Sequence, residues 1–319
     1  MIRSLLGTAT AMALLVLTGC SGPSTSDSAT TASESVQGQE DTFVEIDPNR
    51  LEIQGHRGAR GLVPENSMPG FVLALREGAD VLEMDMCISS DGQIIISHEP
   101  WMNGQICLDP NNAPISESQA KTWNLHNMTA EEIAEFDCGS VALPNFPDQQ
   151  NLPTYKPTLD QVVELAETVP LLDGAQVRYN LEIKHSAELE PEFCPDAATF
   201  AKLVLDKVSA LGIADRVCIQ SFSAAALEAV HQIDPNMTTS WLVGTEGTVQ
   251  SQLDKLTFTP DIYSPQWKLI DAKDVAQLQG QDIRVIPWTA NTKEDLFALI
   301  EMGVNGIITD RPDLLYKMR

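Results

Sequence analysis

Short apolar, strand-like segments alternate with amphipathic helical patterns along most of this chain of 319 residues. Strands are expected near residues 52–57, 81–87, 94–98, 179–184, 216–221, 238–243, 284–289 and 306–309, with a weaker candidate at 261–264. Helices are expected near residues 67–77, 158–168, 196–211, 223–233, 271–279 and 293–302. This alternation predicts a parallel sheet covered by helices. Nine candidates for eight strand positions within residues 43–319 predict an α/β fold of the (β/α)8 TIM-barrel type.

Residues 1–42 have the composition of an export signal and a tether rather than that of a folded domain. In segment 1–19, Arg3 precedes an apolar run at 5–17 that is too short to span a bilayer and is typical of a secretory signal peptide. Leu-Thr-Gly-Cys at 17–20 resembles a lipobox, in which Cys20 receives a diacylglyceryl group; an ordinary cleaved signal, with Cys20 incidental, is the alternative. Segment 20–42 is almost free of large apolar residues and is therefore expected to be a disordered tether.

The lipobox pattern predicts a location as well as a modification. A lipid on Cys20 would anchor the protein without any transmembrane helix. We therefore expect an exported lipoprotein on the periplasmic face of a bacterial membrane, and Ser21 favours the outer membrane if the cell is Gram-negative.

The formal net charge of −25 limits the partners of this chain. Such a surface repels nucleic acid and anionic lipid headgroups. It remains compatible with an anionic small-molecule substrate, because a bound cation can reverse the local field. The sequence does not indicate a protein partner.

The cysteines are expected to serve structure rather than metal binding. Five remain when Cys20 is set aside, so at least one of them is free. Export permits disulfides, and Cys107 and Cys138 bracket a long insert, so they are the pair that we expect to be bridged. Cys87 is expected to be a buried thiol. The chain has no Cys-x-x-Cys motif, which argues against a thiolate zinc site.

Two stretches interrupt the regular alternation. Ser89-Ser90-Asp91-Gly92 is a tight-turn signal that brings the segments on either side close together. Segment 99–157 is rich in Pro, Asn, Asp and Gln and has one short helical pattern near 129–136. A loop of this length in a compact domain is usually functional. We expect an insertion after strand three, lying over the barrel face on which active sites form.

Charged side chains occupy alternate positions of two otherwise apolar strands. Glu83 and Asp85 share one face of their strand, and Glu182 and Lys184 share one face of theirs, because side chains alternate across the pleat. Burying such groups is costly unless they are paired. The three carboxylates are hard oxygen donors that suit Ca²⁺ or Mg²⁺. The alternative is a buried ion-pair network of these carboxylates with Arg57 and Lys184.

Two of the five histidines, His56 and His98, end apolar strands. Such a pair can protonate a leaving oxygen and deprotonate a nucleophile near neutral pH, although a lone histidine at a strand end is more often structural. His126, His185 and His231 lack this context, and His185 is expected at the surface.

Ten short motifs follow one another along residues 53–312. They are His56-Arg57-Gly58, Pro64-Glu65-Asn66-Ser67, Gly78-Ala79-Asp80, Leu82-Glu83-Met84-Asp85, Asp91-Gly92, His98-Glu99, Glu182-Ile183-Lys184, Gln220-Ser221-Phe222, Trp288-Thr289-Ala290-Asn291 and Gly306-Ile307-Ile308-Thr309-Asp310. No single motif is specific. As an ordered set, they resemble the signature of the glycerophosphodiester phosphodiesterase family.

This resemblance implies a (β/α)8 barrel of the phospholipase C-like phosphodiesterase type. It also implies metal-dependent hydrolysis of glycerophosphodiesters to glycerol 3-phosphate and an alcohol. The matching positions are His56 and His98 for acid–base catalysis, Glu83, Asp85 and Glu182 for the metal, and Arg57 and Lys184 for the phosphate. Glu99 stands where the family usually has Asp, and Ser67 where Thr is common. The insertion 99–157 is longer than in compact members, which leaves the alcohol of the substrate open.

Three residues near the expected site each have two interpretations. Trp288 packs against the glycerol moiety or belongs to the core. Asn66 caps the following helix or orients the site. Glu65 is an outer partner of the metal or a base.

Two other functions fit the same fold. One is a related phospholipase C-like enzyme that cleaves intact phospholipid, and the other is a non-catalytic, lipid-anchored binding module. The complete set of histidines and carboxylates favours an enzyme, and the acidic surface favours a small water-soluble diester. The nucleophile, either water or the glycerol hydroxyl of the substrate acting through a cyclic intermediate, stays open.

Overall fold

The computed structural model describes residues 51–319, so the expected signal peptide, Cys20 and the tether lie outside the described residues. Nine strands are present in this part of the chain. They are β1 (Glu52–Gly55), β2 (Val81–Ile88), β3 (Ile94–Ile96), β4 (Arg178–Ile183), β5 (Val217–Ser221), β6 (Thr238–Val243), β7 (Ile262–Pro265), β8 (Arg284–Val285) and β9 (Gly306–Thr309).

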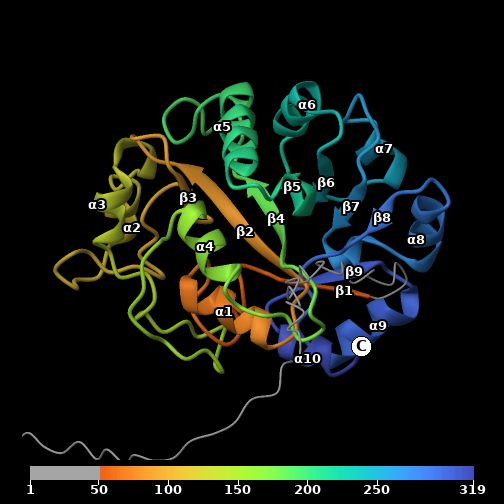
Figure 1. The fold of residues 1–319 in the computed structure, drawn as a ribbon, viewed down its shortest axis with the longest axis horizontal. Coiled ribbons are helices and arrows are strands. Elements are labelled where there is room, and N and C mark those ends of the chain that lie inside the picture. Colours follow the sequence, from red (N-terminus) through yellow and green to blue (C-terminus); the bar gives the residue numbers. More distant parts are fainter. Residues whose placement is uncertain (1–50) are drawn as a thin grey trace, which may run out of the picture. The chain divides into compact units, whose positions relative to one another are not determined.

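Eight of these strands form one sheet of parallel pairs that curls into a barrel (Figure 1). The order is β8-β7-β6-β5-β4-β2-β1-β9. The barrel closes between β9 and the segment after β8. There Trp288 forms a parallel bridge with Ile308, and the Ile308 backbone N–H donates to the Pro287 carbonyl at 2.9 Å. The predicted (β/α)8 barrel is confirmed. Strand β8 is shorter than the expected segment 284–289, because Pro287 has no N–H to continue the ladder.

The third strand of the chain is not one of the eight barrel strands, which corrects its expected place. Strand β3 pairs antiparallel with β2, through the tight turn that begins at Ser89. The weaker sequence candidate at 261–264 instead supplies a barrel strand, β7. The long insertion therefore follows the third strand in sequence, but it lies between the barrel strands β2 and β4.

Helices follow most of the barrel strands. They are α1 (Met68–Arg76), α2 (Glu117–Ala120), α3 (Ala130–Ala134), α4 (Leu159–Ala166), α5 (Ala197–Ala210), α6 (Ala224–Ile233), α7 (Val249–Leu253), α8 (Ala272–Gln279), α9 (Lys293–Met302) and α10 (Pro312–Tyr316). Three-residue 3-10 helices occur at Leu125–Asn127, Ala214–Arg216 and Trp267–Leu269. The sequence did not indicate α2, α7 and α10, because helices of four or five residues are too short to show a periodic apolar face.

Most of the helices surround the ring of strands, whereas α2 and α3 lie beside the β2–β3 hairpin and away from the ring (Figure 1). None of the helices within residues 51–319 has the length and apolar character needed to cross a membrane.

The two faces of the barrel strands have different chemistry. On β2, Leu82, Met84 and Met86 face the helices and belong to the main hydrophobic core. Glu83 and Asp85 alternate with them, so they lie on the inner face, as the sequence predicts. This alternation explains how the strand can be wholly buried and still carry two carboxylates.

A chain of polar side chains runs through the interior of the barrel. Gln54 Nε2 donates to Glu52 at 2.6 Å, and the Asn180 amide nitrogen donates both to Gln54 Oε1 at 2.7 Å and to Gln220 Oε1 at 2.9 Å. Gln220 Nε2 in turn donates to Glu83 Oε1 at 2.7 Å. Each of these residues is buried, so the hydrogen bonds replace the water that their polar groups have lost.

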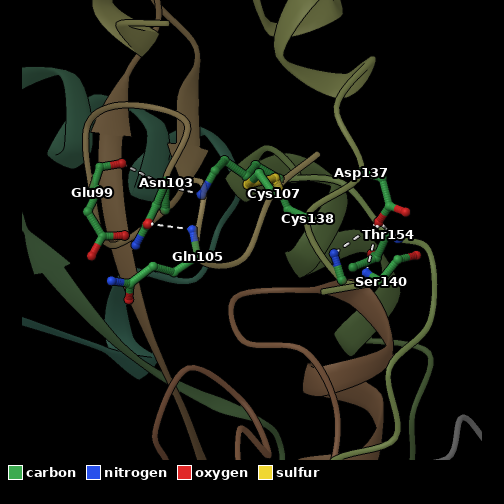
Figure 2. Close-up of a disulfide and its surroundings, with 11 residues drawn as sticks. Glu99, Asn103, Gln105, Cys107, Asp137, Cys138, Ser140 and Thr154 are labelled. Atoms are coloured by element: carbon green, nitrogen blue, oxygen red, sulfur yellow. Dashed lines mark hydrogen bonds between the residues drawn. A yellow bond between two sulfur atoms is a disulfide. The ribbon is translucent and has the colours of Figure 1, made fainter. Parts of the chain in front are cut away.

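The insertion has a small hydrophobic core of its own. It includes Met102, Leu125, Ile133 and Phe136, packed against β2 and β3 through Cys87 and Ile95. A disulfide joins Cys107 to Cys138, the pair expected from the sequence. The bridge lies between a segment that carries Asn103 and Gln105 and a segment that carries Asp137 and Ser140 (Figure 2). The insertion is therefore an ordered subdomain attached to the edge of the barrel strands.

Candidate active site

Three buried carboxylates meet at the inner face of β2 and β4. Asp85 lies directly opposite Glu182 in the parallel register, and Glu83 is one inward-facing position earlier on β2. One oxygen of each carboxylate lies within 4.8 Å of the others. Strand pairing alone therefore gathers the three residues that the sequence singles out as metal ligands.

Neutral groups hold two of these carboxylates in fixed orientations. Glu83 accepts from the Arg57 backbone N–H at 2.8 Å and from Gln220 at 2.7 Å. Asp85 accepts from the Asn66 amide at 2.8 Å. Arg57 and Asn66 both have positive φ angles, 51° and 50°, in the loop after β1. This loop conformation points a backbone N–H and an amide at the carboxylate cluster.

Two cations neutralise part of the cluster. Arg57 Nε lies 3.3 Å from Asp85 Oδ2, and Lys184 Nζ lies 2.8 Å from Glu182 and 3.6 Å from Asp85. Arg57 is also shared with Glu65, at 2.9 Å. Two positive charges therefore face the three clustered carboxylates, and one of them is shared with Glu65, so the buried cluster keeps an excess of negative charge.

The titration behaviour of the cluster reflects that excess. Burial and the adjacent Asp85 charge raise the pKa of Glu83 well above its usual range. Burial opposes ionisation of Asp85 as well, but Arg57 and Lys184 outweigh it and hold the pKa of Asp85 well below its usual range. Burial, opposed by Lys184, raises the pKa of Glu182. Three close oxygen donors with surplus negative charge fit a hard divalent cation.

His56 follows β1, and a carboxylate fixes its ring. Its Nδ1 lies 2.7 Å from Asp310 Oδ1, and the other oxygen of Asp310 accepts from Asn291 at 2.6 Å. Burial lowers the pKa of His56, against the opposing effect of Asp310. Because Nδ1 is engaged by Asp310, Nε2 is the nitrogen left to exchange a proton with a substrate.

His98 follows β3 and has a similar partner next to it in the chain. Its Nδ1 lies 2.9 Å from Glu99 Oε1. Although burial opposes ionisation, the hydrogen bond to His98 and the charge of His98 bring the pKa of Glu99 to about 2. Glu99 therefore holds one nitrogen of the His98 ring, as Asp310 holds one nitrogen of the His56 ring.

Both histidines line a cavity of about 230 Å³ above the carboxylates. Phe222, Leu242 and Trp288 form an apolar part of its wall. The Trp288 ring meets Phe222 edge-on at 5.4 Å, and its indole N–H donates to the Ser264 carbonyl at 2.9 Å. The structure thus places Trp288 at the cavity and holds it there by a core hydrogen bond.

The structure separates the two interpretations of Asn66 and gives Glu65 its partners. Ser67, not Asn66, caps helix α1, and Asn66 orients Asp85 instead. Glu65 pairs with Arg57 and with Arg60, the latter at 2.6 Å, and lies among the site cations.

The expected surface position of His185 is wrong. His185 is buried, with Nδ1 2.8 Å from Ser223 Oγ and Nε2 bonded to Glu190. It is buried because the loop that carries Glu190 folds back over the end of β4, a contact that strand periodicity does not reveal.

Three site residues received no role from the sequence. Asp310 and Asn291 hold His56, and Gln220 holds Glu83. All three stand inside the quoted motifs, and Gln220 is an amide between Ile219 and Ser221 of β5. A polar residue on the inner face of a strand is the signal for Gln220, whereas Asp310 and Asn291 lie outside the strands and only their motifs mark them.

Comparison with known proteins agrees with this site. Residues 56–314 match the family model "Glycerophosphoryl diester phosphodiesterase family". A glycerophosphodiester phosphodiesterase from Bacillus subtilis (strain 168) is 26% identical over 284 residues, covering 86% of this chain and 88% of that protein. Another, from Caldanaerobacter subterraneus subsp. tengcongensis, is 27% identical over 270 residues, covering 83% of this chain and 96% of its own.

Solved structures agree in fold. A protein from Silicibacter pomeroyi DSS-3 with a glycerophosphoryl diester phosphodiesterase description has a TM-score of 0.74 and 26% identity, covering 85% of this chain and 95% of its own. A phosphodiesterase from Oleispira antarctica, solved with the product sn-glycerol-3-phosphate, has a TM-score of 0.66 and 18% identity over 83% of this chain and 95% of its own. The fold and site thus define a barrel enzyme of the phosphodiesterase class. This chain belongs to the glycerophosphoryl diester phosphodiesterase family.

Replacing Asp310 tests how His56 is tuned. In Asp310→Asn, the charge that raises the pKa of His56 is gone while burial still lowers it, so that pKa falls further. We expect the limb of the pH–kcat/KM profile that belongs to His56 to move to lower pH, and turnover to fall about tenfold or more. Asp313→Asn, which removes a carboxylate that pairs with Arg311 outside the cavity, is the matched control. An Asp310→Asn profile identical to that of the control contradicts the assignment.

Proposed function

We propose that this protein hydrolyses glycerophosphodiesters to glycerol 3-phosphate and an alcohol with the help of a divalent cation. The observation that carries the proposal is the arrangement of two carboxylate-held histidines around one buried acidic cluster in a single cavity. The name of the Bacillus subtilis relative and the product bound in the Oleispira antarctica structure support this substrate class.

The charged groups of the site bind the phosphodiester. Arg57 offers a planar fork and Lys184 a point charge, both already close to the acidic cluster. Glu83, Asp85 and Glu182 would hold Ca²⁺ or Mg²⁺. When bound, such a cation neutralises phosphate charge and polarises a phosphoryl oxygen. Electrostatic stabilisation of this kind is usually the largest contribution to catalysis.

The two histidines move the protons. The lowered pKa of His56 keeps its ring neutral near pH 7, so we assign it the role of the base that activates the nucleophile. His98, paired with the ionised Glu99, is assigned the role of the acid that protonates the leaving oxygen. The nucleophile is either water or the glycerol hydroxyl of the substrate, and both leave the histidine roles unchanged.

Histidine variants test the proton transfers. His56→Ala and His98→Ala each remove one transfer and are expected to lower kcat by about 10²–10⁴-fold. The measurement is release of glycerol 3-phosphate from glycerophosphodiesters at saturating substrate. His231→Ala, which alters a histidine stacked on Phe258 outside the site, is the control for general effects. Turnover like that of the wild type in either site variant rules out the mechanism.

Chelation tests the metal. We expect EDTA to abolish activity and added Ca²⁺ or Mg²⁺ to restore it, because the acidic cluster then regains its missing positive charge. The same cation should raise the melting temperature of the wild type but not that of Glu182→Gln, which lacks one ligand charge. Full activity in excess EDTA, with no cation-dependent shift in melting temperature, shows that the cluster is not a metal site.

We further propose that the chain is exported and held at the periplasmic face of a membrane through a lipid on Cys20. The lipobox-like residues 17–20 support this proposal, and they lie outside the described residues. In cells, Cys20→Ser is expected to move the protein from the membrane fraction to the soluble fraction. Cys218→Ser, which alters a free thiol of the barrel, should leave it with the membranes. Membrane retention of the Cys20 variant excludes lipid anchoring.

A further inference from the structure

Two cavities are both lined by Arg57. A phosphodiester carries two alcohol groups, here called its arms, and each needs space in the site. The first is the cavity of about 230 Å³ that contains both histidines. The second, of about 340 Å³, has walls made largely by the insertion. Arg57 and Arg60 line both cavities, so a phosphate held by Arg57 can place one arm in each.

We propose that the second cavity binds the alcohol arm of the substrate and selects hydroxyl-rich alcohols, such as glycerol or a cyclitol, over choline. This inference rests on the proposed function and adds to it the class of alcohol. It also gives the long insertion a role.

The walls of this second cavity are held in place from several sides. Residues 103–106 form one wall and residues 142–146 another. Cys107 directly follows the first wall, and its disulfide joins it to Cys138, in the segment that leads to the second wall (Figure 2). Farther along, the buried Gln149 amide donates to the Arg60 carbonyl at 2.7 Å and to the Val63 carbonyl at 3.2 Å. These hydrogen bonds connect the segment after the second wall to the barrel loop that carries Arg60.

The charged groups of this cavity are already engaged within the protein. Glu65 is shared by Arg57 and Arg60, and Glu99 accepts from His98. Both acidic groups of the cavity are therefore engaged within the protein, and the second oxygen of Glu99 is buried, so neither carboxylate is presented to a positively charged alcohol. The cavity is not built to recognise an ammonium group by charge.

The aromatic side chain of the cavity is engaged as well. Phe146 is the aromatic residue among the described residues that line it. The Arg60 guanidinium lies over its ring, 4.6 Å from the centroid. Recognition of a quaternary ammonium depends on exposed aromatic faces, and here that face is covered by another cation. A choline group would therefore gain little in this cavity.

Side-chain amides that line this cavity have free hydrogen-bonding groups with which to contact a ligand. Among residues 51–319, the side chains of Gln105 and Asn145 make no hydrogen bond, and Asn103 uses only its carbonyl oxygen, which accepts from the Gln105 backbone N–H at 2.9 Å. Glu99, Asn103 and Gln105 extend to the same side of the disulfide (Figure 2). A carboxamide both donates and accepts, as a hydroxyl does, so several amides suit a polyhydroxylated group. A quaternary ammonium can neither donate to nor accept from them.

The test compares two substrates that differ only in the alcohol. The full-length protein is assayed with glycerophosphoinositol and with glycerophosphocholine, and kcat/KM is measured from glycerol 3-phosphate release. We expect the wild type to favour glycerophosphoinositol by about tenfold or more, the gain from two ordinary hydrogen bonds. In the double variant Gln105→Ala/Asn145→Ala, that ratio should fall about tenfold, mainly through KM. Both residues are exposed, so the variant should melt at the wild-type temperature.

A second double variant, Asn111→Ala/Gln150→Ala, removes two exposed amides that do not line the cavity and should leave the ratio unchanged. A preference for glycerophosphocholine, or a ratio that is the same in both double variants, overturns the inference while leaving the proposed function intact. An equal loss on both substrates in Gln105→Ala/Asn145→Ala also overturns it, because the cavity then binds the arm that the substrates share. If no diester yields glycerol 3-phosphate, the proposed function itself fails, and the inference with it.

Discussion

The burial of like charges at the mouth of the barrel is the constraint on which the rest of this structure depends. Glu83, Asp85 and Glu182 are brought within 4.8 Å of one another by strand pairing, in a place where water cannot screen them. Arg57, Lys184 and two neutral amides compensate part of this charge. The remaining negative charge favours a cation, and in the proposed function that cation is what makes this acidic cluster able to hold a phosphodiester.

Local patterning made much of the fold predictable, and long-range contacts made the rest unpredictable. Strand alternation placed Glu83 and Asp85 on the inner face of β2, and motif order placed His56 and His98 in one site. The tight turn at 89–92 was visible in the sequence, but the nine strand candidates did not show which one lies outside the barrel, and the strand at 94–96 pairs antiparallel with β2 instead of joining it. The burial of His185 and the pairing of His56 with Asp310, 254 positions away, arise only when distant segments meet.

The insertion shows how a barrel can gain a second cavity without disturbing its own core. Its apolar side chains pack on the face of the β2–β3 hairpin that carries Cys87 and Ile95, opposite the face that belongs to the main core. The disulfide then fixes two stretches of irregular backbone that a small core alone would hold weakly. The acidic cluster therefore lies on the barrel strands and most of the second cavity on the insertion, while Glu99, at the start of the insertion, connects the two through its hydrogen bond to His98.

The hydrogen-bonded polar side chains inside the barrel determine whether a proton can pass between Glu52 and Glu83. Glu52 and Glu83 stand at the two ends of this series and accept from Gln54 and Gln220, while the Asn180 amide donates in both directions and its own carbonyl oxygen is left buried without a partner. Every link between Glu52 and Glu83 is thus an amide N–H, and amides do not release their protons near neutral pH. This series of hydrogen-bonded side chains does not conduct protons. It therefore offers no route for proton transfer between Glu52 and Glu83.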